Sequence, residues 1–148
     1  MQITSSENKV LVRWLIEELF NRKRTEVTRF LYASECRGNT PDGSFANRHE
    51  FLAGFAHYAA AFPNFRVEID NLVADEDRVA VHYTFVGANT GSWAGLPPTG
   101  QMVRIGGAMI SRISHSRIIQ QDFVWDVLSA RRQFWIKPAR PSILRSAA

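Results

Sequence analysis

The hydrophobic pattern changes at one point of the chain, in the stretch Ala61-Phe-Pro-Asn-Phe-Arg-Val-Glu-Ile-Asp70. Before Pro63 the apolar residues recur at the spacing of one helix face. After Pro63 they alternate with polar residues, which is typical of a half-buried strand. The stretch therefore divides the chain into an N-terminal helical part and a C-terminal part made of strands.

The N-terminal part predicts helices separated by one long loop. Residues 8–21 carry an amphipathic pattern, and a shorter helix is expected over residues 25–32. Glycine and proline mark residues 36–44 as a loop. A last helix of this part begins after Asn47, a favoured N-cap residue, and ends at Pro63.

The C-terminal part predicts strands that follow one another as antiparallel neighbours. The expected strands cover residues 65–69, 79–86, 102–113 and 117–125, with a hairpin turn at 114–116 and a short helix over 126–133. Helices followed by such strands indicate the α+β class. We expect three N-terminal helices to pack on one face of a curved antiparallel sheet and to enclose an internal pocket.

Length and composition indicate one soluble domain. A chain of 148 residues with 45% hydrophobic residues can bury its own core. We expect this domain to cover residues 1–134, and a basic, proline-containing tail to cover residues 135–148. No apolar run reaches the roughly 20 residues needed to cross a bilayer, and no secretory leader is recognisable. A cytoplasmic location is therefore expected, and a lone Cys36 agrees with it.

Several classes of function have no support in the sequence. The net charge is +4, but the basic residues are scattered rather than gathered in a stripe, which argues against a nucleic-acid partner. The four histidines show no recognised ligand spacing, so no metal site is predicted. No phosphate-binding loop or dinucleotide fingerprint occurs, and the expectation is an activity without a cofactor. Neither a membrane nor a nucleic acid is an expected partner.

Six short motifs together resemble the SnoaL-like polyketide cyclases, small members of the cone-shaped fold shared with ketosteroid isomerase. They are Asn8-Lys-Val-Leu-Val-Arg, Ala61-Phe-Pro-Asn-Phe-Arg-Val, Asp77-Arg-Val-Ala-Val-His-Tyr-Thr-Phe-Val-Gly, Thr90-Gly, Gly95-Leu-Pro-Pro-Thr-Gly and Val124-Trp-Asp. The resemblance implies that the expected sheet forms a cone-shaped barrel around the pocket. It also implies a cofactor-independent enzyme of secondary metabolism that closes rings by aldol-type proton transfer on a polyketide or aromatic intermediate. The alternatives are a related isomerase, an epoxide-opening or hydroxylating enzyme, or a non-catalytic binding domain.

The resemblance points to Asp122 as the general acid/base, because ring-closing members use an aspartate on the last strand. Asp122 shares one strand face with Gln120 and Val124, and either this face or the opposite one lines the pocket. A carboxylate among aromatic groups loses solvation, so its pKa rises and it can take a proton next to a carbonyl. The alternative is a structural Asp122 that accepts hydrogen bonds or faces water.

The resemblance also implies a histidine across from this aspartate, but the chain has Ala108 there. Another group must then donate a proton, and we expect Tyr83 to do so because a phenol can donate into an oxyanion site. The alternative for Tyr83 is a core residue. Gln120 and Arg104 could also reach the pocket, although Arg104 is equally consistent with a surface position.

Aromatic side chains are expected to form the pocket wall and to suit a flat aromatic ligand. The candidates are Trp14, Phe55, Tyr58, Phe62, Tyr83, Phe85 and Trp93. Some of them would also be needed for an ordinary core. The apolar alternation on the outer sheet face, together with the habit of the resembled family, predicts a homodimer through that face.

Overall fold

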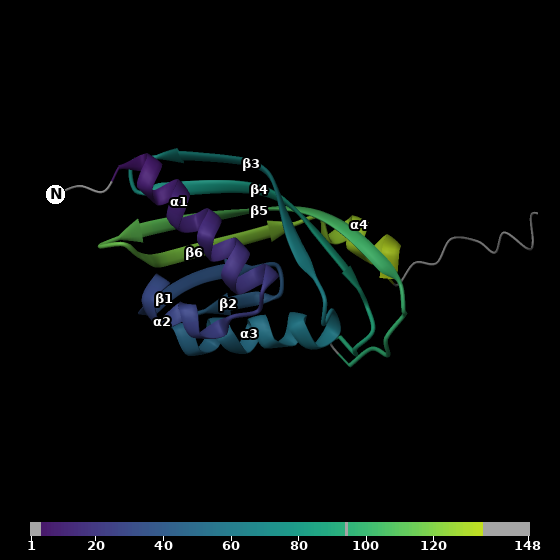
Figure 1. The fold of residues 1–148 in the computed structure, drawn as a ribbon. Helices are drawn as coiled ribbons and strands as arrows, with labels where there is room; N and C mark the ends of the chain where they lie inside the picture. Colours follow the sequence, from purple (N-terminus) through teal and green to yellow (C-terminus); the bar gives the residue numbers. More distant parts are fainter. Residues whose placement is uncertain (1–3, 94, 135–148) are drawn as a thin grey trace, which may run out of the picture.

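A computed structural model describes residues 4–93 and 95–134 of the chain (Figure 1). The elements in chain order are α1 (Ser5–Leu15), the π-helix η1 (Ile16–Asn21), the 3₁₀ helix η2 (Thr25–Val27), α2 (Thr28–Leu31), β1 (Tyr32–Thr40), β2 (Gly43–Phe45), α3 (Arg48–Ala61), β3 (Arg66–Asp75), β4 (Arg78–Ala88), β5 (Met102–Ser114), β6 (Arg117–Trp125) and α4 (Val127–Phe134). The expected tail, residues 135–148, lies outside the described residues.

The strands form one six-stranded sheet in the order β2-β1-β6-β5-β4-β3. Strands β3 to β6 make an antiparallel meander, as the sequence predicts, and the α+β class is confirmed. The sheet differs from the expectation in two ways. It is mixed, because β1 runs parallel to β6, and it stays open, with β2 and β3 at its edges.

The predicted loop over residues 36–44 is wrong, because this segment forms the β1–β2 hairpin. Pro41 and Asp42 make the turn, and Gly38 pairs with Phe45 across it. Glycine is required at position 38, since a Cβ there would lie 1.8 Å from the main-chain oxygen of Gln121. A glycine that signals a loop in the sequence thus marks a close approach of β1 to β6.

The helix starts follow from side-chain caps. Thr4 and Glu7 form a reciprocal capping box at α1, with hydrogen bonds of 3.2 and 3.0 Å between side chain and backbone. Asn47 caps α3 by accepting a hydrogen bond from the backbone N–H of Glu50. These caps fix the positions at which the helices that cover the sheet begin.

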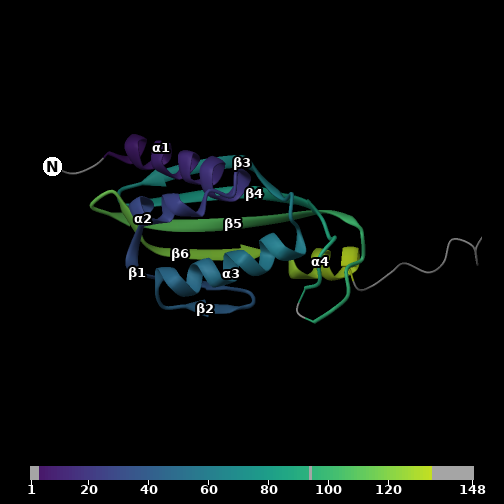
Figure 2. The ribbon, with the colours of Figure 1, turned by 60° about the horizontal axis from the view of Figure 1, so that its bottom comes forward.

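The helices lie against the inner face of the curved sheet and enclose the core. α1 contacts β3 and β4, whereas α3 contacts β1 and β2, so the two helices cover different parts of this face (Figure 2). Inner positions alternate along the strands and pair across them, as Val81 does with Met109. Both of these side chains are buried.

The end of the first helix is held to the sheet by polar side chains. Asn21 exchanges hydrogen bonds with the backbone of Val67 in β3, donating at 3.2 Å and accepting at 2.7 Å. Lys23 donates to the carbonyl oxygens of Phe20 and Phe65 and lies 3.7 Å from the centroid of the Phe65 ring. Burial lowers the pKa of Lys23 to about 8.

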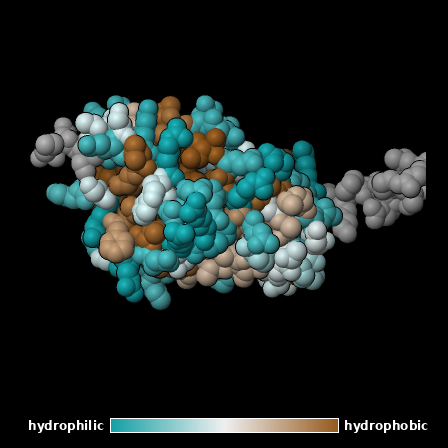
Figure 3. All heavy atoms as spheres, in the orientation of Figure 1, coloured by the Kyte–Doolittle hydropathy of each residue, from teal (hydrophilic) through white to brown (hydrophobic). Residues whose placement is uncertain are grey.

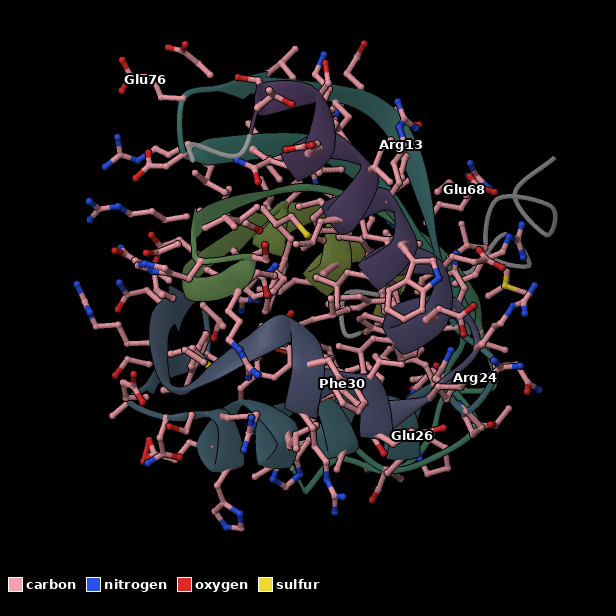
Figure 4. All side chains as sticks on the ribbon, turned by 60° about the vertical axis from the view of Figure 1, so that its left-hand side comes forward. Arg13, Arg24, Glu26, Phe30, Glu68 and Glu76 are labelled. Atoms are coloured by element: carbon pink, nitrogen blue, oxygen red, sulfur yellow. The ribbon has the colours of Figure 1, made fainter. Side chains whose placement is uncertain are left out.

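The face of the protein drawn in Figure 3 has the mixed polarity that is usual for a folded domain. Polar and apolar side chains are interspersed over the face seen in Figure 3. Glu68 projects from β3 into solvent and forms ion pairs with Arg66 and Arg104 (Figure 4). Within residues 4–93 and 95–134, none of the helices has the length and apolar character needed to span a membrane.

Candidate functional site

A cavity of about 620 Å³ lies between α3 and the inner face of the sheet. Its wall is mainly aromatic: Phe20, Phe45, Phe51, Phe55, Tyr58, Phe62, Phe65, Tyr83, Phe85, Trp93, Phe123 and Trp125. Such a volume and lining are typical of a site for one small organic molecule. The curvature of the sheet and the aromatic stripe of α3 together create this pocket.

The rings pack on one another, so the wall is preorganised. Phe65 stacks on Phe85 at 5.0 Å, and the ring of Phe55 meets Phe65 edge-on at 5.8 Å. Phe20, on the π-helix, contacts both Phe55 and Phe123. Interlocked rings of this kind leave flat apolar surfaces against which an aromatic ligand can stack.

A carboxylate and a phenol meet at the pocket mouth. Asp42 is exposed in the β1–β2 turn, and its Oδ2 accepts a hydrogen bond from the Tyr58 hydroxyl on α3. Burial, and then the adjacent Asp42 carboxylate, raise the pKa of Tyr58 far above its usual value. Tyr58 therefore stays protonated and acts as a hydrogen-bond donor at neutral pH.

A second phenol, that of Tyr83, lies inside the pocket on β4. Its side chain lines the cavity, and the residue is only 5% exposed. Burial raises the pKa of Tyr83 well above its usual value, and the hydroxyl makes no hydrogen bond to any residue that the structure describes. A buried donor of this kind gains free energy when a ligand supplies an acceptor.

The absence of a side chain at Gly107 leaves the space that the Tyr83 ring occupies. Gly107 pairs with Tyr83 across the β4–β5 ladder, and a Cβ at position 107 would lie 2.7 Å from both Cζ and Oη of Tyr83. The same Cβ would lie 2.7 Å from the carbonyl oxygen of Val124. Only glycine at this position leaves room for the phenol.

A buried polar network lies beside the pocket, behind Met109 and Phe123. Tyr32 donates to Oε1 of Gln121 at 2.5 Å, and Nε2 of Gln121 donates to the Ser111 hydroxyl at 2.8 Å. All three side chains are fully buried. The polar groups satisfy one another, so this network serves the packing of β1, β5 and β6.

Most of the predicted aromatic residues lie in the pocket wall. The structure places Phe55, Tyr58, Phe62, Tyr83, Phe85 and Trp93 there. Trp14 does not join them, because it projects from α1 on the side away from the sheet and is 48% exposed. The helical period does not distinguish the two sides of α1 clearly, since Val10 and Trp14 extend its apolar pattern onto the outer side.

Asp122 lies outside the pocket, contrary to the expectation. Its Oδ1 accepts hydrogen bonds from the backbone and side-chain nitrogens of Asn39 at 3.0 and 3.3 Å, and Gln120 donates to its Oδ2 at 3.1 Å. The residues on either side, Gln121 and Phe123, are the ones that face the core. Asp122 therefore ties β1 to β6 on the outer sheet face.

The other polar candidates share this outer face. Ala108 pairs with Val124 there, and Gln120 is engaged by Asp122. Arg104 is exposed and binds Glu68 on β3 at 3.0 Å. Strand alternation places these residues opposite the inward-facing Ile105 and Met109, so none of them lines the pocket.

Several pocket residues were missed from the sequence. Asp42 lies in the segment read as a loop, where Pro41-Asp42-Gly43 is a good turn signal that could have indicated a hairpin. Trp125 and Phe123 lie on the strand face opposite Asp122, and their aromatic character could have identified that face as the inner one.

Among the described residues, no three His, Cys, Asp or Glu side chains form a metal-binding group.

Fold and pocket together define a small α+β protein with a pocket lined by aromatic residues, and the sequence identifies its family. Residues 9–134 match the model of the SnoaL-like polyketide cyclases. The chain belongs to this family, which confirms the resemblance seen in its motifs. No curated protein matches the chain.

Solved structures share the fold. A candidate SnoaL-like polyketide cyclase from Jannaschia sp. CCS1 has a TM-score of 0.84 at 22% identity, covering 90% of this chain and 95% of its own. AclR from Streptomyces galilaeus, a candidate hydroxylase, gives 0.81 at 20% identity, with coverages of 97% and 90%. IdmH from Streptomyces antibioticus, a candidate polyketide cyclase, gives 0.74 at 23% identity, with coverages of 83% and 94%.

Proposed function

We propose that the protein is a cofactor-independent enzyme that transfers protons during ring closure of a polyketide-like or other aromatic substrate. The observation that carries this proposal is the combination of a carboxylate, Asp42, at the mouth of an aromatic pocket and a buried phenol, Tyr83, inside it. Membership of the SnoaL-like polyketide cyclase family supports a cyclase-type function in general.

Asp42 is the proposed general base. Its Oδ2 is held by the Tyr58 hydroxyl, which leaves Oδ1 available for a proton. Because Tyr58 is fixed on α3 among the pocket rings, this hydrogen bond orients an otherwise exposed turn residue toward the cavity. A base held in place in this way meets the geometric requirement of general base catalysis.

Tyr83 is the proposed donor to the oxygen that becomes negative. Its proton is retained at neutral pH, because burial raises the phenol pKa, and its hydroxyl borders the cavity. A donor that is already in position in an apolar site stabilises an enolate without reorganisation. Ala108, the position at which the resemblance implies a histidine, lies on the outer sheet face, so Tyr83 is the proposed donor inside the pocket.

The reaction follows from these two roles. Asp42 removes a proton from a carbon next to a substrate carbonyl, and the enolate oxygen accepts a hydrogen bond from Tyr83. The enolate carbon then attacks a second carbonyl carbon of the same molecule, so that a carbon–carbon bond forms and the second carbonyl oxygen becomes an alkoxide. The alkoxide takes the proton back from Asp42, which regenerates the carboxylate.

Proton exchange at a model ketone tests this proposal without knowledge of the natural substrate. Acetonaphthone has an aromatic ring system and exchangeable protons next to its carbonyl, so incubation in D₂O should give protein-dependent deuterium incorporation, measured by mass spectrometry. Tyr83→Phe is expected to slow the exchange by about 10²- to 10³-fold. Exchange at the same rate with and without the protein would contradict the proposal.

A hydroxylating enzyme is the second candidate function. AclR, a candidate hydroxylase, shares this fold at 20% identity, so the fold is compatible with such an activity. Such an enzyme would use the same base to form an enolate and would then require oxygen. Oxygen consumption in the presence of an aromatic substrate, measured with an electrode, distinguishes this function from ring closure.

We also propose that the protein forms a homodimer through the outer sheet face. Val73, Ile110 and Val124 project from this face with exposed fractions of 62%, 48% and 62%. Ala80 pairs with both Val73 and Ile110, and Ala108 pairs with Val124, so these apolar residues are neighbours on the outer face, where Asp122 pairs with Ile110. Neighbouring exposed apolar side chains can mark an interface.

A further inference from the structure

Three half-buried aromatic rings form a cluster in the pocket wall, and one of them, Tyr58, binds the Asp42 carboxylate at the mouth. Tyr58 lies between two indoles, with ring centroids 6.0 Å from Trp93 and 5.6 Å from Trp125. The Tyr58 and Trp125 rings are nearly perpendicular, at 85°. Because the Tyr58 hydroxyl also binds Asp42, the mouth combines aromatic faces of different orientation with a negative charge.

The charged side chains that line this pocket are acidic, although the chain as a whole is basic. The protein has 18 lysines and arginines, but none of them belongs to the described residues that line the cavity. The charged side chains that do line it are Asp42 and Glu50, with His57 as the remaining titratable base. Lys23, which lies behind the Phe65 ring, is held by two backbone carbonyl oxygens.

From this arrangement we infer that the mouth binds a positively charged amine. The inference rests on the proposed function and narrows its substrate class to aromatic compounds that carry an ammonium group. Ring faces attract a cation through their quadrupole, and groups of aromatic rings are a known solution for binding ammonium ligands. The Asp42 carboxylate adds Coulomb attraction at the same place.

The inferred ligand fits both parts of the cavity. Its planar apolar portion would lie against the phenylalanine rings that line the cavity, such as Phe55 and Phe65, and its ammonium group would stay near Asp42 at the mouth.

Isosteric ligands that differ in charge test this inference. We would measure the Kd values of naphthylmethylamine, naphthylmethanol and naphthoate by calorimetry at neutral pH, where they are cationic, neutral and anionic. The amine should bind about 5- to 30-fold more tightly than the alcohol, as expected for a partly desolvated cation on aromatic faces. The carboxylate should bind more weakly than the alcohol, because it meets Asp42 and Glu50.

Variants locate the effect. Trp93→Leu and Asp42→Asn should each reduce the preference for the amine over the alcohol, while Trp14→Leu, on the exposed side of α1, should leave it unchanged. Equal binding of the amine and the alcohol by the wild-type protein, or a preference for naphthoate, would overturn the inference. Deuterium exchange into acetonaphthone does not require an amine. A wild-type protein that catalyses this exchange but does not prefer the amine would refute this inference and leave the proposed function standing.

Discussion

The Tyr58 hydroxyl donates a hydrogen bond to Oδ2 of Asp42 and so joins α3 to the β1–β2 turn at the mouth of the pocket. The two residues are 16 positions apart in the sequence and come from different elements. The helix supplies a donor that is fixed among aromatic rings, and the turn supplies a carboxylate that would otherwise move freely in solvent. The proposed base is therefore positioned by the fold rather than by its own element.

Gly107→Ala should displace the Tyr83 phenol from its position in the pocket. The new Cβ would lie 2.7 Å from Oη and Cζ of Tyr83, so that ring must move. We expect the free energy of unfolding to fall by about 1–3 kcal/mol and the exchange of acetonaphthone protons to slow in the folded fraction. Thermal unfolding and the exchange assay on one preparation measure both effects.

The neighbouring glycine offers a matched control for this variant. A Cβ at Gly106 would meet nothing within 4 Å, because that position lies on the outer sheet face. Gly106→Ala should therefore keep both stability and exchange close to those of the wild type. If the two variants behaved alike, the close approach of Gly107 to Tyr83 would not explain the loss.

The sequence predicted the order of elements from α3 to α4, because hydrophobic period and turn residues are local properties. It did not predict the β1–β2 hairpin, since the pairing of β1 with β6 depends on contacts between distant segments, such as Gly38 against the Gln121 backbone. The parallel pairing cannot be read from alternation, which is the same for either strand direction.

The prediction of the site residues depended on which face of β6 lines the pocket, and alternation alone does not decide this. Two faces of β6 alternate equally well, and the resemblance favoured the face of Asp122, whereas the inner face carries Phe123 and Trp125. A bulge in β6 also breaks the alternation near its start, because the register shifts between Arg112 and Ile113 on β5. Tyr83 was placed in the pocket because the inner face of β4 is apolar throughout.

The tyrosines should resist ionisation in the native protein. The chain has three tyrosines, and the pKa values of Tyr32, Tyr58 and Tyr83 are all raised, in each case first by burial. The absorbance of tyrosinate should thus stay low as the pH passes the ordinary tyrosine pKa of about 10 and should rise only on unfolding. Full ionisation of one or more phenols at pH 10 in the folded state would contradict these environments.

The same shifts determine the direction of the stability change. Above the ordinary tyrosine pKa, the unfolded chain loses phenolic protons that the folded chain keeps. The free energy of unfolding should therefore be fully retained below that pH and should fall as the pH rises above it. Urea unfolding at a series of alkaline pH values measures this decrease.

Ile110→Glu should separate the proposed dimer. The change places a charge beside Ala80 on the outer face, where burial against a partner would remove it from water. Light scattering should give a dimer mass for the wild type and a monomer mass for the variant. Val10→Glu, at an exposed apolar site on α1, is the control that should leave the mass unchanged. A wild-type protein that is monomeric would contradict the proposed interface.

The central claim is that Asp42, and not Asp122, is the base. Two matched substitutions test it directly: Asp42→Asn and Asp122→Asn, each assayed for deuterium exchange into acetonaphthone. Asparagine keeps the shape of the side chain but cannot accept a proton. We predict that Asp42→Asn slows exchange by ~10²- to 10⁴-fold with little change in stability. Asp122→Asn should keep the exchange rate and lose about 0.5–1.5 kcal/mol of stability, because it weakens the bonds to Asn39 and Gln120. Loss of exchange in Asp122→Asn, with full exchange in Asp42→Asn, would contradict the account.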